Sequence, residues 1–409
     1  MKNQFQNPKN THNTIDFLNL PNVPNFLKKD VKEKLAFVGE FILRVSILEN
    51  GTLIRFHLKK KLDGRNRKKF NKDVAKVVEN LVVGAFEPRI RTLENYLDRP
   101  VHYYLDPTLK LIEAGELIQE GSGYHILGPK LTRLISFIER RFLKLAKSMG
   151  AQPYQFPALI PADYMEKVKY FSNFPHSLSF VSHLKEDLEV IEKFASLACC
   201  SDGVVDFPKE SYSSPKAMLT PTVCHHLFYA LANKAIPSDG LTVTAYGNCF
   251  RYESTNMVSL ERLWNFTMRE IIFVGSEKYV KDGLDHVRRK LRTVLADLQL
   301  AYKIETASDP FFIGTHKNQT AYQNALELKF ELRALLPFKK ESIAVGSFNR
   351  HQDFFGTQLN FVMDNGDIPQ TGCIGLGYER LAYAFVSQHG LDTKNWPNRV
   401  RKYMENESL

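Results

Sequence analysis

The stretch CFRYESTNMVSLERLWNFTMREIIFVG, residues 249–275, has the pattern of a strand, a loop and a returning strand. Arg251 and Glu253 are two positions apart, so on a strand their side chains point to the same face. A guanidinium can hold a phosphate through two parallel hydrogen bonds, and an aromatic ring such as Phe266 offers a flat surface for a purine. These residues fit a nucleotide site, although a charged hairpin with surface ion pairs explains them equally well.

A second stretch, TGCIGLGYER (371–380), is rich in glycine and precedes the helical pattern LAYAFVSQHG. It does not match GxxxxGK[ST], and it does not match GxGxxG because Arg380 stands where the third glycine belongs. By itself, this stretch predicts a tight turn before a helix.

A third stretch, KLTRLISFIERRFLKLAKSMG (130–150), predicts a long amphipathic helix, because apolar residues recur every three or four positions. The prolines of AQPYQFPALIP (151–161) keep the next segment extended, at a sheet edge or an interface. Several β-rich runs follow, among them LTVTAYGNCFRYE, SIAVGSF and TQLNFVMDNGD. Consecutive strands joined by short turns favour an antiparallel sheet, so we expect an α+β fold in which helices flank that sheet.

Taken together, the three stretches resemble the signature motifs of class II aminoacyl-tRNA synthetases. SMGAQPYQFPALIP resembles motif 1, FRYE…RLWNFTMRE resembles motif 2, and GLGYERLAYAF resembles motif 3, and they occur in the family's order. The resemblance covers residues 121–409. It implies the catalytic domain of these enzymes and a homodimer formed through motif 1.

The resemblance also implies roles for individual residues. Arg251 would hold the α-phosphate of ATP and neutralise the charge that develops there, and with Arg380 it is an expected catalytic residue. Phe266 and Arg380 would enclose the adenine, Glu253 would read the adenine amino group, and Arg262 would assist Arg380 at the γ-phosphate. The expected reaction is in-line attack of an amino-acid carboxylate on ATP, with Mg²⁺ among the cofactors.

The five cysteines are too few and too irregularly spaced for a disulfide framework. Cys224, Glu270 and Cys373 stand at what we expect to be strand edges, and two thiolates, a carboxylate and an open position suit Zn²⁺. No local spacing such as CxxC predicts this site, and a lone buried cysteine usually acts as a small hydrophobic residue.

Two related groups place Cys, Glu and Cys at these motif positions: the atypical seryl-tRNA synthetases of methanogens and the amino acid:[carrier protein] ligases. Resemblance to them implies a zinc ion that binds the substrate amine. We expect the remaining cysteines to have packing roles: Cys199, Cys200 and Cys249.

Several features bear on the choice between these two groups. Ala344 stands where seryl enzymes usually place a glutamate that binds metal and ATP, and GSFNRHQDFFG (346–356) is closer to the ligases. The sequence predicts a helix at 184–198 with Ser182 as its N-cap. This helix is the candidate docking site for an acidic carrier protein. That it packs on the core instead is an equally good interpretation. In contrast, the compact ligases generally lack a domain like residues 21–120, whereas methanogen-type seryl enzymes have an N-terminal domain that binds tRNA.

The leading hypothesis is a ligase that activates glycine, alanine or serine with ATP as an aminoacyl-adenylate. It would then pass the aminoacyl group to the phosphopantetheine thiol of a carrier protein. One alternative is a seryl-type enzyme that charges tRNA, and another is a catalytically silent paralogue that serves as a binding module. The sequence does not determine which of these amino acids is the substrate, because one methyl group changes the binding free energy in a pocket by only about 1–3 kcal/mol.

The N-terminal part of the chain differs in composition from the rest. Residues 1–20 are polar and rich in asparagine, and predict a flexible tail. Residues 21–120 predict an accessory α/β domain, with a hairpin at the Asn50–Gly51 dipeptide. A run with seven basic residues and one acid (59–70) predicts a loop before a helix at 71–83.

The net charge of +10 favours an acidic partner. The chain shows no secretory signal and no apolar run of about 18 residues, so we expect a cytoplasmic enzyme without membrane contact.

Overall fold

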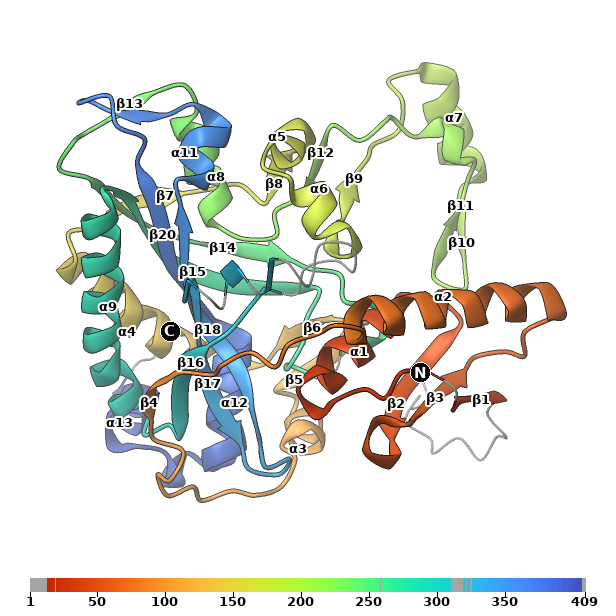
Figure 1. Ribbon diagram of the computed structural model, residues 1–409, viewed down its shortest axis with the longest axis horizontal. Coiled ribbons are helices and arrows are strands. Elements are labelled where there is room, and N and C mark those ends of the chain that lie inside the picture. Colours follow the sequence, from red (N-terminus) through yellow and green to blue (C-terminus); the bar gives the residue numbers. More distant parts are fainter. Residues whose placement is uncertain are drawn as a thin grey trace.

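A computed structural model describes residues 13–18, 20–257, 259–309, 319–320, 322–323 and 326–406. Its centre is an eight-stranded sheet with the strand order β4-β16-β17-β18-β20-β15-β14-β7. Helices cover this sheet, and a smaller group of strands and helices from the N-terminal part of the chain lies beside it (Figure 1). This arrangement confirms the predicted α+β class.

The central strands are antiparallel, as predicted, although neighbours such as β15 and β20 are not consecutive in the chain. They are β18 (Glu341–Gln352), β20 (Gln370–Gly377), β15 (Asn265–Gly275) and β14 (Leu241–Phe250). At the end of the sheet, β7 (Gln152–Gln155) pairs with β14 in parallel. β7 contains Pro153, which lacks a backbone N–H and therefore suits an edge strand. The extended stretch after the long helix is thus a sheet edge.

Alternate residues of β15 enter two different cores, because successive side chains of a strand point to opposite faces. Ile271 and Phe273 belong to the larger core, and Ile272 and Val274 belong to the smaller one. The larger core is covered by three helices: α4 (Pro129–Ser148), α9 (Glu277–Asp297) and α12 (Tyr378–His389). The smaller core includes residues of α8 (Cys224–Leu231) and α11 (Phe354–Leu359). The long helix predicted at 130–150 is confirmed as α4.

An ion pair joins α4 to the sheet. The Nε of Arg269 in β15 donates to Glu139 at 2.9 Å, and the Tyr378 hydroxyl also donates to Glu139. Arg269 has the same parity as Ile271, so its side chain lies on the α4 face of the sheet. Within the stretch 249–275, this arginine therefore anchors the helix, whereas Ile272 and Val274, which have the opposite parity, face the smaller core.

The N-terminal region has a core of its own, which includes Phe56, Phe70 and Val74. Its sheet has the order β1-β3-β2, and its elements are β1 (Asn13–Phe17), α1 (Lys28–Leu35), β2 (Ile42–Leu48), β3 (Leu53–Leu58) and α2 (Gly64–Val82). The hairpin at Asn50–Gly51 is confirmed, because both residues have positive φ, 55° and 102°.

Three expectations for this region need revision. Residues 13–17 form β1 and pair with β3, so the polar stretch 1–20 is not a tail throughout, and residues 1–12 lie outside the described part of the chain. The basic run 59–70 is not a loop throughout, because α2 begins at Gly64. Asp63 caps this helix, and its side chain accepts from the amide of Asn66 at 2.8 Å. β4 (Thr92–Asn95) pairs with β16 (Tyr302–Thr306) in the large sheet. We therefore propose a domain boundary before β4 instead of at residue 120.

The helix predicted at 184–198 is shorter than expected. α7 spans Leu188–Leu197, and its N-cap is Asp187, whose side chain accepts from the amide of Val190. Ser182 was the wrong cap, because its hydroxyl donates to the carbonyl of Ser213 in a neighbouring segment. No residue of α7 is buried. Packing of this helix on the core is therefore excluded.

The described residues also form the following α-helices and strands. They are α3 (Thr108–Glu113), β5 (Leu117–Gly121), β6 (Tyr124–Leu127), β8 (Leu159–Pro161), α5 (Ala162–Lys167), α6 (Tyr170–Asn173), β9 (Phe180–Val181), β10 (Cys199–Ser201), β11 (Val204–Asp206), β12 (Ala217–Leu219), β13 (Ala235–Ile236), β17 (Lys329–Leu336), β19 (Val362–Met363) and α13 (Asn398–Asn406). None of the helices in the described ranges has the length and hydropathy required to span a bilayer.

Candidate active site

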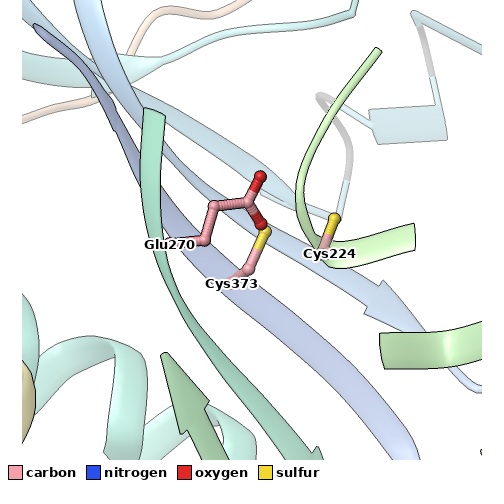
Figure 2. A group of neighbouring side chains, drawn as sticks. All are labelled: Cys224, Glu270 and Cys373. Carbon is pink, nitrogen blue, oxygen red and sulfur yellow. The ribbon is translucent and has the colours of Figure 1, made fainter. Parts of the chain in front are cut away.

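Cys224, Glu270 and Cys373 lie together although they are far apart in sequence. Their ligand atoms are all within 4.8 Å of one another, and all three residues are buried. Figure 2 shows Glu270 and Cys373 on neighbouring strands, with Cys224 opposite them at the start of a helix. Glu270 pairs with Gly375 in the register of β15 and β20, two positions from Cys373, so both side chains share one face. Cys224 is the first residue of α8, not a strand-edge residue as we expected.

The surroundings of the Glu270 carboxylate favour a cation. Its Oε1 accepts from the Thr222 hydroxyl at 2.5 Å and from the Val223 amide at 3.2 Å. Its Oε2 is buried and has no hydrogen-bond partner among the described residues. A buried carboxylate oxygen without a partner is costly, and a bound cation would remove that cost.

Both thiols have raised pKa values. The contact with Cys373, burial and the nearby Glu270 raise the pKa of Cys224 well above its ordinary value. The hydrogen bond with Cys224 lowers the pKa of Cys373, but burial and Glu270 outweigh it and raise this pKa as well. Asn349 donates to the Cys373 sulfur at 3.6 Å. The nearby Glu270 disfavours ionisation of both thiols, and a divalent cation would favour it instead.

These three residues fit zinc. Two sulfurs and one carboxylate oxygen supply three ligands of a tetrahedral site and leave the fourth position open. His351 is also near, with its Nε2 3.9 Å from the Cys373 sulfur. Burial lowers the pKa of His351 to about 4, so its imidazole is neutral at pH 7. The protein therefore offers a buried and closely spaced set of potential metal ligands, with thiol sulfurs, a carboxylate oxygen and an imidazole nitrogen.

The three residues line a cavity of about 730 Å³. The same cavity is bordered by Arg251, Glu253 and Arg262 of the stretch that resembles motif 2. A smaller neighbouring cavity shares Arg251, Glu253 and Gly375 with it and adds Phe266 and Arg380. The structure thus brings all the predicted site residues to one continuous region of the catalytic sheet: Cys224, Arg251, Glu253, Arg262, Phe266, Glu270, Cys373 and Arg380.

Arg251 and Arg380 are held in place by backbone carbonyls. The Nε of Arg251 donates to Pro221 at 2.9 Å, and its guanidinium lies 5.4 Å from the centre of the Phe266 ring. An Nη of Arg380 donates to the carbonyl of Ala344 at 2.9 Å. Burial and the neighbouring Arg262 lower the pKa of Arg380 to about 10, so it stays charged at pH 7. Fixed, buried guanidinium groups that repel one another form a suitable site for an anion.

Other residues at the site carried no clear sequence signal. Glu379 accepts from the amide and the hydroxyl of Thr267, at 2.8 and 2.7 Å, which joins the start of α12 to β15. Lys329 pairs with Asp309 at 2.5 Å at the edge of the large cavity. Glu33 and Lys34 come from the N-terminal region and also line this cavity. Motif 3 could have indicated Glu379, but nothing local to α1 indicated Glu33 or Lys34.

Comparisons with known proteins agree with the fold. The seryl-tRNA synthetase of M. kandleri, solved with a tRNASec of A. aeolicus, matches with a TM-score of 0.69 and 23% identity, over 90% of this chain and 74% of that one. The type-2 serine–tRNA ligase of Methanothermobacter thermautotrophicus is 26% identical over 73% of this chain, which spans only 60% of that relative. The fold is therefore that of the class II aminoacyl-tRNA synthetases.

A more similar group of relatives gives the family. Amino acid–[acyl-carrier-protein] ligase 1 of Bradyrhizobium diazoefficiens is 31% identical over 66% of this chain and 82% of its own length. No protein-family profile matches the chain. The chain belongs to the amino acid–[acyl-carrier-protein] ligase family and is an enzyme of the ligase class.

Proposed function

We propose that this enzyme activates a small amino acid with ATP and transfers it to the phosphopantetheine thiol of a carrier protein. One observation carries the proposal: Cys224, Glu270 and Cys373 line the same cavity as Arg251, Glu253 and Arg262. The residues proposed to recognise the amine of the amino acid therefore line the same cavity as the residues proposed to recognise ATP, so the two substrates can meet there. The similarity to carrier-protein ligases supports the choice of acceptor.

The chemistry requires positioning and charge stabilisation, with no protein nucleophile. A carboxylate oxygen of the amino acid attacks the α-phosphorus, the bond to pyrophosphate breaks, and an aminoacyl-adenylate results. The acceptor thiol then loses its proton and attacks the carbonyl carbon, and AMP leaves. Arg251 would stabilise the α-phosphate, Phe266 and Arg380 would enclose the adenine, and Glu253 would accept from its amino group.

Two metals belong to this proposal. Zn²⁺ would be held by Cys224, Glu270 and Cys373, and would supply an open coordination position for the amino group of the substrate. Mg²⁺ would arrive with the phosphates of ATP, as it commonly does in nucleotide sites. Ala344 offers no side-chain oxygen there, and its carbonyl instead holds Arg380.

The exposed helix α7 is the proposed docking surface for the carrier protein. Leu188, Ile191 and Leu197 are 72%, 46% and 69% exposed. In Figure 1, α7 projects away from the catalytic sheet together with β10 and β11. Cys199 and Cys200 lie on β10 and are exposed, so our expectation that they pack in the core was wrong. Leu188 and Ile191 are three positions apart and therefore share one face of α7, and exposed apolar residues grouped on one face suit an interaction site.

A variant of α7 tests this surface. In the double variant Leu188→Asp/Ile191→Asp, we expect aminoacyl transfer to the carrier protein to fall about tenfold or more, because a single apolar anchor contributes roughly 1–2 kcal/mol to an interface. Amino-acid-dependent ATP–pyrophosphate exchange should not change. Ser196→Ala on the same helix is the matched control and should leave both rates as they are. Equal transfer by the double variant and the parent would exclude α7 as the docking helix.

Aminoacylation of tRNA is the second candidate function. The fold match to a seryl-tRNA synthetase covers 90% of the chain, and α2 has an exposed basic face that includes Arg65, Lys68 and Lys72. No ion pair of these three cations occurs in the described structure. Such a surface suits a polyanion, but it suits an acidic carrier protein as well.

A labelling experiment separates the two acceptors. The enzyme is incubated with ATP, a radiolabelled amino acid (glycine, alanine or serine), total tRNA and a phosphopantetheinylated carrier protein. We expect the label on the carrier protein, sensitive to thiol reagents, and none on tRNA. Label on tRNA alone would replace the proposed acceptor, and absence of any pyrophosphate exchange would favour the catalytically silent alternative.

The resemblance to motif 1 leads us to propose a homodimer through the region of α4 and β7. Tyr154 on β7 and Leu159, the first residue of β8 in a separate small sheet, are 43% and 44% exposed. Large apolar side chains at an exposed sheet edge are typical of a surface that a second subunit covers. Sedimentation velocity would report the mass of the particle in solution.

A further inference from the structure

The N-terminal region contributes side chains to the wall of the large cavity. Glu33 and Lys34, near the end of α1, and the nearby Phe37 line it. Lys34 is only 4% exposed, and its Nζ lies 3.2 Å from the Nε2 of His176 in the catalytic body. The rings of Phe37 and His176 are in edge contact, with centroids 5.1 Å apart. The accessory domain is therefore part of the site and not a separate appendage.

Three polar contacts join the end of α1 to the loop between β14 and β15. The Ser254 hydroxyl donates to the carbonyl of Ala36 at 3.2 Å, and the Asn256 amide donates to the carbonyl of Glu33 at 3.1 Å. The third contact is an ion pair between the Glu33 carboxylate and the guanidinium of Arg262. This loop contains the residues that resemble motif 2, so α1 touches the nucleotide side of the site.

Arg262 is shared by two carboxylates. One Nη donates to Glu253 and the other donates to Glu33, and the three side chains are only 15–25% exposed. Burial raises the pKa of Glu33. Burial acts on Glu253 in the same direction, but the attraction of Arg262 and Arg380 outweighs it and lowers that pKa. Glu33 is therefore the less well stabilised of the two anions, and the easier one to displace.

We propose that Glu33 is a built-in competitor for the terminal phosphate of the nucleotide at Arg262, so that the accessory domain sets the affinity for ATP. This inference depends on the proposed function and on the role at the γ-phosphate that the resemblance to motif 2 implies for Arg262. Carboxylates and phosphates use the same paired donors of a guanidinium, so the two anions exclude each other there. A second reason is charge, because an ionised Glu33 repels a phosphate strongly in a partly buried site.

The competition couples nucleotide binding to the position of α1. By thermodynamic linkage, ATP must weaken the contact between Glu33 and Arg262 by the same factor by which that contact weakens ATP binding. Binding of ATP should therefore loosen the end of α1 from the loop at Ser254 and Asn256. AMP lacks the terminal phosphate and should not loosen this contact.

The decisive experiment measures nucleotide affinities of the full chain by calorimetry. In Glu33→Gln, which keeps the shape but removes the charge, we expect the dissociation constant for ATP to fall about fivefold or more, a typical size for coupling between sites. The dissociation constant for AMP should stay the same. An unchanged or weaker affinity for ATP, or an equal gain for AMP, would overturn the proposal.

A control variant separates charge from mere loosening of the domain. Ser254→Ala removes one neutral hydrogen bond of the same contact, and by the same linkage we expect it to raise the ATP affinity by much less than Glu33→Gln does. An equal gain in Ser254→Ala would show that loosening alone explains the effect and would overturn the role of the carboxylate. Hydrogen exchange of the unmutated chain provides a test without a variant: residues 28–36 should exchange faster with ATP than with AMP, and equal exchange would contradict the coupling. If the parent binds no ATP at all, the proposed function fails, whereas ATP binding without a difference in Glu33→Gln overturns only this inference.

Discussion

The variant Arg251→Ala is expected to lower amino-acid-dependent ATP–pyrophosphate exchange by about 10²–10³-fold, the usual cost of removing one fixed charge or donor that stabilises a transition state. Arg251 lines both cavities of the site. Its Nε donates to the carbonyl of Pro221 at 2.9 Å, which fixes the guanidinium and leaves its Nη atoms available to a phosphate. Because the guanidinium is already oriented, little reorganisation is needed when negative charge develops on the α-phosphate.

Two control variants make this test specific. Arg251→Lys keeps the positive charge but loses the paired donors, so its exchange rate should lie between those of the alanine variant and the parent. Arg55→Ala removes an exposed arginine that pairs with Asp16 in the accessory domain at 2.7 Å, and its exchange rate should equal that of the parent. Exchange at the parental rate in Arg251→Ala would mean that the nucleotide lies elsewhere.

The second large effect concerns the buried thiols. In Cys373→Ser, we expect the zinc content per chain to fall at least about tenfold, because a neutral hydroxyl is a much poorer ligand than a thiolate. The KM for the amino acid should rise more than the KM for ATP, because the metal would contact the amine and not the nucleotide. Metal analysis after dialysis measures the first change, and exchange kinetics with each substrate varied measure the second.

One of the two exposed cysteines, Cys200, provides the matched control for this experiment. Cys200→Ser makes the same chemical change on β10, away from the candidate metal ligands, and should keep the parental zinc content. Cys249 is buried but belongs to a small separate cluster with Val223 and Ala245, so it is not expected to bind metal. Equal zinc content in Cys373→Ser and the parent would remove Cys373 from the site.

Local sequence patterns predicted most of the fold correctly. The apolar spacing of 130–150 gave α4, and the positive φ that Asn50–Gly51 favours gave the hairpin of β2 and β3. Local patterns predicted the structure wrongly where contacts with the rest of the protein decide how a segment folds. The apolar residues of α7 have helical spacing, but the helix begins at Leu188 and no other element of the described structure buries it. Periodicity reports that a helix has an apolar face, and it cannot report what covers that face.

For the site, the amino-acid sequence by itself determined the chemical groups: guanidinium groups and an aromatic ring in 249–275, and candidate ligands at Cys224, Glu270 and Cys373. Only the tertiary structure decided that these ligands lie within 4.8 Å of one another, because that depends on the register of β15 against β20 and on the position at which α8 begins. The contact of Glu33 with Arg262 spans 229 residues and left no local pattern. Short-range spacing fixes which face of an element a side chain occupies, whereas contacts between distant elements are fixed by the way the elements pack.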